Sequence, residues 1–330
     1  MTWKYLSSDA ELFERELASF VPPKVFDAHV HLYDVRHSKT AAPPLLMDGP
    51  KSTGWQAFSE HICQIVPGRE VTGLCFPFPL PELDINAAND FVRDEVRKSP
   101  GSRAQMLIHP TMDPELIRQT VRRDRFVGLK CYHVYSRETP TFDATIPSFL
   151  PEQHVRVAHQ EGLTITLHMV RSRALGDPMN QEAICSYARR YLNARLILAH
   201  AARGFNPHHT ISGIASLAGL SNVWFDTSAV TDSGAFEAIL QTIGPQRLMY
   251  GSDFPVSQLR GRCVALGDSF VWLTEGNVDL VQPFGKVVPT LVGLESLRVL
   301  KLACTSLRMS DEHVERIFFG NAAELFGLCT

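Results

Sequence analysis

The chain of 330 residues has no long apolar run, no excess of one charge and no regular spacing among its few cysteines. A membrane-spanning helix needs about 18 to 20 consecutive apolar residues, and no segment approaches that length, so no membrane interaction is expected. Lys and Arg number 32 against 35 Asp and Glu, a net charge of −3. Nucleic-acid-binding proteins usually have a strong basic bias, so nucleic acid is not an expected partner.

The seven cysteines lie at positions 63, 75, 131, 185, 263, 304 and 329 and include no CxxC pair. An odd, scattered set is typical of reduced thiols in a cytoplasmic protein rather than of a disulfide framework. The first 20 residues contain four acidic side chains and lack the apolar core of a signal peptide. No repeat, low-complexity tract or flexible linker divides the chain, which predicts a single domain over 1–330.

Short apolar runs alternate along the chain with stretches of helical period. Eight runs are strand candidates: 24–31, 71–77, 103–109, 126–132, 162–168, 194–200, 222–228 and 247–253. Helical patterns occupy most of the gaps, at 85–98, 114–123, 151–160 and 181–191. This alternation indicates an α/β protein with a parallel sheet, and eight units match a (β/α)8 TIM barrel, which needs about 250 residues. A doubly wound open sheet is the alternative, but it would leave the polar strand ends without a common centre.

Three segments lie outside this repeating pattern. Residues 8–20 predict a helix within an N-terminal extension, 1–21. Long connections follow the first strand, at 35–68, and the eighth strand, as an insertion at 257–294. Both begin at the carboxyl end of a strand, where barrel enzymes carry their active-site loops. Such loops serve as lids or as subunit contacts, so a homodimer is one expectation.

The first strand candidate contains two histidines two residues apart, in the sequence VFDAHVH. Side chains alternate between the faces of a strand, so His29 and His31 share one face, with Asp27 one step deeper. The residues between them are expected to face the helices: Phe26, Ala28 and Val30. Two imidazoles at a strand end can hold one metal ion, although an HxH pair alone is a weak signal.

Three further strand candidates end in a polar residue that could bind the same metal ion. The fifth ends in His168 after inward Thr164 and Thr166, the sixth ends in His200, and the eighth ends in Asp253. In a closed barrel these ends converge on one axis, which predicts a metal site. Imidazole and carboxylate without thiolate suit Zn²⁺, Mn²⁺ or Fe²⁺. Such an ion activates water, and a base must accept the proton; His200 and Asp253 are the candidates.

As a set, these motifs resemble the amidohydrolase superfamily. The resemblance rests on His29-x-His31, on His168, on His200 in LILAHAARG and on Asp253 in YGSDFP. More narrowly, the chain resembles the branch that contains aminocarboxymuconate-semialdehyde decarboxylase, hydroxybenzoate-type decarboxylases and lactone hydrolases. The tail IFFGNAAELFGL, at 317–328, is similar to the closing helix of that branch. The resemblance covers about 24–256 and 312–328.

The resemblance implies a role for each matching residue. His29, His31 and His168 would be metal ligands, Asp253 a ligand or a close base, and His200 the residue that orients or deprotonates water. The segments GSDFP and NAAELF resemble the branch with one metal, so one divalent ion is expected, with Zn²⁺ first and Mn²⁺ or Fe²⁺ as alternatives.

Substrate-binding candidates lie on the fourth strand and after the sixth. The segment GLK at 128–130 resembles the family's G-x-K motif and makes Lys130 a candidate; by alternation Tyr132 shares its face, and His133 begins the loop. Arg203 follows His200 by three residues, and Arg36, Arg171 and Arg173 follow other strands of the rim. Arginines hold carboxylates in a bidentate manner, so a small anionic substrate is expected.

Three functions are compatible with these residues. The favoured one is a metal-dependent hydrolase acting on a lactone or a carboxylated ring. The second is a metal-dependent non-oxidative decarboxylase of a carboxylated ring. The third is a barrel without catalytic activity, which has no chemical need for all five converging residues. Asp226, at the end of the seventh strand, is expected either to support the barrel or to contact substrate.

Overall fold

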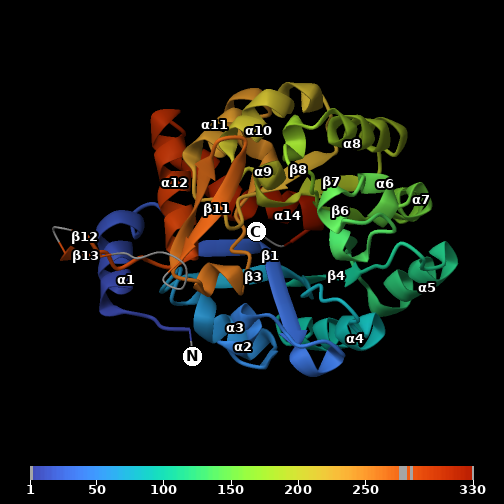
Figure 1. Ribbon diagram of the computed structural model, residues 1–330, viewed down its shortest axis with the longest axis horizontal. Coiled ribbons are helices and arrows are strands. Elements are labelled where there is room, and N and C mark those ends of the chain that lie inside the picture. The colour runs from blue at the N-terminus through green and yellow to red at the C-terminus, as the bar shows by residue number, and fades with distance from the viewer. Residues whose placement is uncertain (1–2, 275–280, 283–284, 329–330) are drawn as a thin grey trace.

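The computed structural model describes residues 3–274, 281–282 and 285–328, and it contains an α/β barrel (Figure 1). One sheet has the strand order β2-β1-β3-β4-β5-β6-β7-β8-β9. All neighbours are parallel except β2 (Ser52–Thr53), which pairs antiparallel with β1. The parallel strands are β1 (Lys24–Asp34), β3 (Glu70–Pro77), β4 (Arg103–Leu107), β5 (Gly128–Tyr132), β6 (Thr164–His168), β7 (Arg195–Leu198), β8 (Val223–Asp226) and β9 (Leu248–Met249). They correspond to the eight predicted strands, so the predicted barrel architecture is confirmed.

Backbone hydrogen bonds between β1 and the segment after β9 close the ring. The N–H of Ala28 donates to the carbonyl of Tyr250 at 2.8 Å, and the N–H of Asp253 donates to the carbonyl of His29 at 3.0 Å. The N–H of His31 donates to the carbonyl of Phe254 at 2.9 Å. Because the sheet closes, the carboxyl ends of all eight strands surround one axis.

Helices cover the outside of this ring (Figure 1). The predicted helical stretches correspond to α4 (Ile85–Val96), α5 (Pro114–Asp124), α7 (Glu152–Glu161) and α8 (Pro178–Arg190). The others are α1 (Ser7–Leu12), α2 (Pro44–Met47), α3 (Trp55–Ile62), α6 (Ile146–Phe149), α9 (Ala199–Arg203), α10 (Pro207–Gly213), α11 (Ser233–Thr242), α12 (Val292–Ser306), α13 (Asp311–Glu315) and α14 (Asn321–Phe326). Aspartates cap several of them; Asp113, for example, accepts the N–H of Glu115 ahead of α5, as expected for an N-cap. No described helix has the length and apolar character required to cross a membrane.

The barrel interior corrects one prediction about β1. Apolar side chains of five strands and of α14 form a buried cluster separate from the outer core, and its member Phe76 packs against His29 and Lys130 of the site. The cluster consists of Phe26, Ala28, Leu74, Phe76, Ile197, Trp224, Met249, Ala322 and Leu325. Phe26 and Ala28 therefore point inward, and the expectation that they face the helices is wrong. Asp27 lies on the opposite face from them, so it does not share the face of His29 either. The pairing of β1 with β3 is irregular between Asp27 and Val30, and such a bulge shifts the alternation by one residue. Val30 packs in the outer core as expected.

The predicted extension and insertion lie against each other. The N-terminal helix continues from α1 into a π-helical turn, Phe13–Leu17. Its buried Asp9 pairs with Arg260 and accepts the hydroxyl of Thr290 at 2.9 Å, so it holds both ends of the insertion. The insertion contains a hairpin, β10 (Gly261–Leu266) and β11 (Ser269–Thr274), and a shorter one, β12 (Val281–Gln282) and β13 (Gly285–Lys286). Parts of the insertion, 275–280 and 283–284, and Cys329 lie outside the described residues.

Candidate metal centre and active site

Three buried side chains from different strand ends converge at the carboxyl end of the barrel. His29 of β1, His200 after β7 and Asp253 after β9 each offer a ligand atom, and these atoms all lie within 4.8 Å of one another. Gly251 makes the approach possible, because a Cβ at this position would lie 3.1 Å from the Cβ of His29 and 3.2 Å from the Cβ of Ser228. Predicted residues from three strands are thus brought together.

The two histidines of β1 are oriented by acceptors behind them. Nδ1 of His29 lies 2.9 Å from a carboxylate oxygen of Asp226, and Nδ1 of His31 lies 3.1 Å from the carbonyl oxygen of Pro77. Both partners can only accept, so each Nδ1 carries the proton and each Nε2 carries the free lone pair. Burial lowers the pKa of both imidazoles, which favours this neutral, ligating form.

Asp253 is the shared neighbour of these imidazoles. Its Oδ1 lies 3.4 Å from Nε2 of His29 and 3.6 Å from Nε2 of His31, and its Oδ2 lies 3.8 Å from Nδ1 of His200. These distances exceed those of good hydrogen bonds, and the ligand atoms of His29, His200 and Asp253 lie within 4.8 Å of one another. A buried carboxylate surrounded by imidazole nitrogens suits a divalent cation. The ligand atoms present therefore fit a metal centre.

Asp226 was expected either to support the barrel or to contact substrate. In the structure it contacts other residues of the site, which favours a supporting role. Besides His29, it accepts the backbone N–H of His200 at 2.8 Å, and it accepts both the backbone N–H and the hydroxyl of Ser228. Burial opposes its charge, but the contacts with His29, His200 and Ser228 outweigh burial and hold the pKa of Asp226 well below its usual range. The carboxylate therefore orients His29 and the start of the turn at His200.

A left-handed turn after β7 positions His200 and Arg203. Every residue from His200 to Arg203 has a positive φ, between 51° and 60°. For non-glycine residues this conformation costs roughly 1 kcal/mol or more each, and such strain concentrates at functional sites. The turn places Nε2 of His200 3.0 Å from Nδ1 of His168, and Nη1 of Arg203 3.5 Å from Nε2 of His168.

His168 therefore lies outside the group of His29, His200 and Asp253, but it contacts His200. The ring of Tyr132 lies 4.5 Å from the ring of His168, so the predicted candidates Tyr132 and Arg203 flank the same imidazole. His133 begins a short 3-10 turn, as expected for the start of the loop. Whether His31 and His168, or His200, complete the ligand set with His29 and Asp253 stays a prediction.

Lys130 is fully buried beside the candidate metal centre. Its Nζ lies 3.4 Å from Nε2 of His29 and 4.5 Å from the centre of the Phe76 ring. Burial lowers the pKa of Lys130 to about 8, against the opposing attraction of Asp226 and Asp253. An ammonium here is therefore the nearest cation to the converging ligands among the described residues.

The other predicted rim cations are engaged elsewhere. Arg36 pairs with Asp34, Arg171 pairs with Asp177, and Arg173 lies 3.7 Å from a carboxylate oxygen of Asp268. Of the four arginines named from the sequence, only Arg203 contacts a residue of the site in the described structure.

The β10–β11 hairpin of the predicted insertion lies against the segment that carries His200 and Arg203, at the end of the barrel where the sequence placed an active-site loop. Asn206 donates to the carbonyls of Gly267 and Ser269 at 3.1 and 2.9 Å. Phe270 of the hairpin packs 5.0 Å from Phe205, and the Arg203 guanidinium lies 5.5 Å from the Phe270 ring. The insertion therefore brings an aromatic side chain next to the predicted anion-binding residue.

The fold and this site define a metal-dependent α/β-barrel enzyme, and comparisons with known proteins identify its family. Residues 82–328 match the sequence profile of the family described as Amidohydrolase. The chain belongs to this amidohydrolase family, so it is an enzyme and the non-catalytic barrel is set aside. A curated relative, L-fucono-1,5-lactonase from Burkholderia ambifaria, is 31% identical over 121 residues. That alignment spans 32% of this chain and 41% of the relative.

Solved structures share the fold at low sequence identity. An amidohydrolase from Burkholderia multivorans has a TM-score of 0.60 and 15% identity over 92% of this chain and 99% of its own; another crystal form of it has bound zinc. A probable 2-pyrone-4,6-dicarboxylic acid hydrolase from Acinetobacter baumannii has a TM-score of 0.58 and 16% identity over 92% and 99%. The 5-carboxyvanillate decarboxylase from Sphingomonas paucimobilis has a TM-score of 0.55 and 15% identity over 93% and 100%.

Proposed function

We propose that this enzyme hydrolyses the ester bond of a small lactone that carries a carboxylate, with one zinc ion bound at the His29 centre. The observation that carries the proposal is the position of two cations against the converging ligands. Nζ of Lys130 lies 3.4 Å from Nε2 of His29, and Nη1 of Arg203 lies 3.5 Å from Nε2 of His168. A carboxylate bound between these cations would bring the rest of a small ring over the centre.

The protein's own residues have separate tasks in this proposal. His29 and Asp253 would hold the ion together with His31 and His168, or with His200. Asp226 keeps the proton of His29 on Nδ1, which leaves the lone pair of Nε2 available for a metal. Bound zinc supplies the Lewis acidity that activates water and polarises a carbonyl oxygen. Asp253 accepts the proton from the attacking water, and His200 is the second candidate for this step.

Water then adds to the lactone carbonyl, and the ring C–O bond breaks. The proton that Asp253 received is returned to the ring oxygen as it leaves, and the product is a hydroxy acid. The hairpin contact with Arg203 supports a covered site, in which charge–charge contacts are stronger than in bulk water.

The second candidate is a non-oxidative decarboxylase, and it rests on the same pair of cations. A carboxylate held by Lys130 and Arg203 could also be the group that leaves. The fold similarity to 5-carboxyvanillate decarboxylase supports this alternative, and the lactonase relative and the pyrone dicarboxylic acid hydrolase neighbour support hydrolysis.

The two candidates differ in their products, so one assay distinguishes them. Zinc-loaded enzyme is incubated with L-fucono-1,5-lactone, 2-pyrone-4,6-dicarboxylate and 5-carboxyvanillate in parallel, and acid release and CO₂ release are both recorded. We expect acid release without CO₂ from the pyrone dicarboxylate. If CO₂ is released from the carboxyvanillate and no acid from the other two compounds, the enzyme is a decarboxylase and the proposal of hydrolysis is wrong. The same assay is run on Arg203→Gln, which removes one of the two cations proposed to bind the carboxylate. Arg36→Gln is the matched control, because Arg36 is an exposed arginine paired with Asp34.

The cellular location and assembly are part of the same proposal. The six described cysteines are unpaired, which supports a cytoplasmic enzyme. A homodimer stays a prediction, and sedimentation equilibrium of the purified protein tests it. We propose neither a nucleic-acid partner nor a membrane partner.

A further inference from the structure

A cavity lies at the opposite end of the barrel from the active site. It has a volume of about 680 Å³ and is lined by residues at the carboxyl ends of α4 and α5 and at the start of β4. Val127, directly ahead of β5, also lines it. In a TIM barrel this end does not carry the active site, so the proposed lactonase reaction does not account for the cavity. Its volume falls in the range of small-ligand sites, about 300 to 1,000 Å³.

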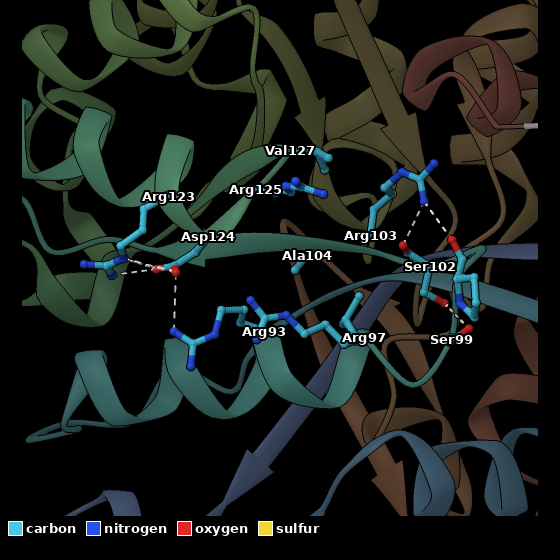
Figure 2. Close-up of a pocket in the computed structure, with 12 residues that line it drawn as sticks. Arg93, Arg97, Ser99, Ser102, Arg103, Ala104, Arg123, Asp124, Arg125 and Val127 are labelled. Carbon is cyan, nitrogen blue, oxygen red and sulfur yellow. Dashed lines mark hydrogen bonds and ion pairs between the residues drawn. The ribbon is translucent and has the colours of Figure 1, made fainter.

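Arginines dominate the lining of this cavity (Figure 2). Five guanidinium groups surround it, from Arg93, Arg97, Arg103, Arg123 and Arg125, and Asp124 is the carboxylate among the lining residues. In the view of Figure 2, Arg93 and Arg97 lie along α4 on one side of Ala104, and Arg103 and Arg125 lie on the other.

Three of the five arginines are neutralised by carboxylates. Arg93 pairs with Asp90, Asp94 and Asp124, at 2.9 Å in the case of Asp94. Arg97 also pairs with Asp94, at 3.1 Å, and Arg123 pairs with Asp124, at 2.6 Å. Three carboxylates therefore face five guanidinium groups, which leaves two positive charges without a counter-charge among the described residues.

Arg103 and Arg125 carry this excess charge. Among the described residues, Arg103 donates only to the backbone carbonyls of Pro100 and Ser102, at 3.2 and 3.0 Å. Arg125 forms no ion pair within the part of the chain that the structure describes. The helix dipole accounts for basic residues in the last turn of α5, but Arg103 lies on a strand and outside any helix.

Arg125 has a backbone conformation in which glycine is the usual residue, so the presence of an arginine there needs an explanation. Arg125 ends α5 in the left-handed region, at φ 60°. Glycine is the usual residue at this position, and glycine occupies it at the ends of α7 and α14, as Gly162 and Gly327. The chain therefore keeps an exposed arginine where glycine would remove the strain.

We infer that this cavity binds a small polyanion, one with two or more phosphate or carboxylate groups that engage Arg103 and Arg125. Guanidinium groups bind both kinds of oxyanion in a bidentate manner, and two uncompensated cations match a dianion. The ion pairs with Asp90, Asp94 and Asp124 hold the remaining arginines in place around it. This site is independent of the proposed hydrolysis.

Isothermal titration calorimetry on the full-length, zinc-loaded protein tests the inference. Two probes separate the sources of the anion: propane-1,3-diyl bisphosphate and glutarate. We expect saturable binding of at least one probe at low ionic strength, and an at least tenfold higher Kd in Arg103→Gln and in Arg125→Gln. Arg122→Gln is the matched control, because Arg122 is exposed on the same helix, pairs with Glu161 and does not line the cavity.

Arg203→Gln separates this site from the active site, and its Kd for the bound probe is expected to be unchanged. Arg125→Gly should abolish binding while it preserves or raises the Tm, because glycine relieves the backbone strain. Absence of saturable binding by both probes would overturn the inference. Equal weakening in Arg122→Gln, loss of binding in Arg203→Gln, or a Tm lowered by Arg125→Gly would also overturn it.

Discussion

Replacement of Asp226 by asparagine should weaken metal binding without removing any ligand. The carboxylate accepts the Nδ1 proton of His29 at 2.9 Å, while its other oxygen accepts the backbone N–H groups of His200 and Ser228. In Asp226→Asn the amide oxygen can keep those backbone bonds, which turns the NH₂ group toward His29. Two donors would then face each other, so the His29 proton has to move to Nε2, the nitrogen that faces the centre.

The size of the effect follows from this change of tautomer. Loss of the carboxylate partner of a ligating histidine typically costs 10- to 100-fold in metal affinity, which corresponds to roughly 1.4 to 2.8 kcal/mol. Asp27→Asn is the matched control. Asp27 is also a buried aspartate near the centre, but its hydrogen bonds are to the backbone N–H groups of His29 and Ser252, at 3.1 and 2.8 Å, and to the Ser252 side chain, rather than to an imidazole.

Competition with a chromophoric zinc chelator measures the affinity, and circular dichroism checks that each variant is folded. We expect a 10- to 100-fold weaker affinity in Asp226→Asn and a change of less than about threefold in Asp27→Asn. A folded Asp226→Asn protein that binds zinc as tightly as the parent would refute the argument that this carboxylate sets the tautomer of His29.

Further expectations concern proton transfer, substrate charge, the hairpin and pH. Asp253→Asn should lower kcat on the order of 100-fold, and near-normal steady-state turnover at full metal content would exclude Asp253 as the base. Arg203→Gln should raise the KM of a carboxylated lactone at least tenfold and leave that of a neutral lactone nearly unchanged; equal effects on both would argue against anion binding. Asn206→Ala removes two hydrogen bonds to the hairpin, so limited proteolysis should cut near residue 267 faster than in the parent. Burial raises the pKa of Asp27 to about 7, above its unfolded value of about 3.9, so the proton favours the folded state. The Tm of the metal-free parent, relative to Asp27→Asn, should therefore fall as the pH rises from about 4 to about 7 and stay level above that, and a constant difference would contradict this.

The sequence predicted the ring of strands well because its signals are local. Apolar runs at regular spacing indicate strands without knowledge of their partners. The inward placement predicted for Thr164 and Thr166 agrees with the position of their neighbours Ile165 and Leu167, which pack in the outer core. The same rule failed at Phe26 and Ala28, because the bulge in β1 depends on its pairing with β3. Nothing in the local pattern of β1 indicates where that pairing slips.

The converging residues were also predictable, but their mutual contacts were not. Polar residues at strand ends identified His29, His200 and Asp253, since a barrel brings such ends together. The contact between His168 and His200 depends on the left-handed turn that starts at His200. No glycine marks that turn in the sequence HAAR, so the usual signal for positive φ was absent. The role of Asp226 had a signal, an acidic residue at a strand end, but only its distance to His29 distinguishes support from substrate contact.

The central claim, a single divalent metal held by the histidines of β1, is tested most directly by elemental analysis. The alternative is a centre of two metals bridged by a carboxylated Lys130, which bicarbonate would favour. Protein purified with excess zinc and bicarbonate is therefore compared with His29→Ala/His31→Ala and with Lys130→Ala. We predict one metal per chain in the parent, a content near zero in the double variant, and no loss in Lys130→Ala. Full occupancy in the double variant, or two metals per chain with the loss of metal in Lys130→Ala, would contradict the account.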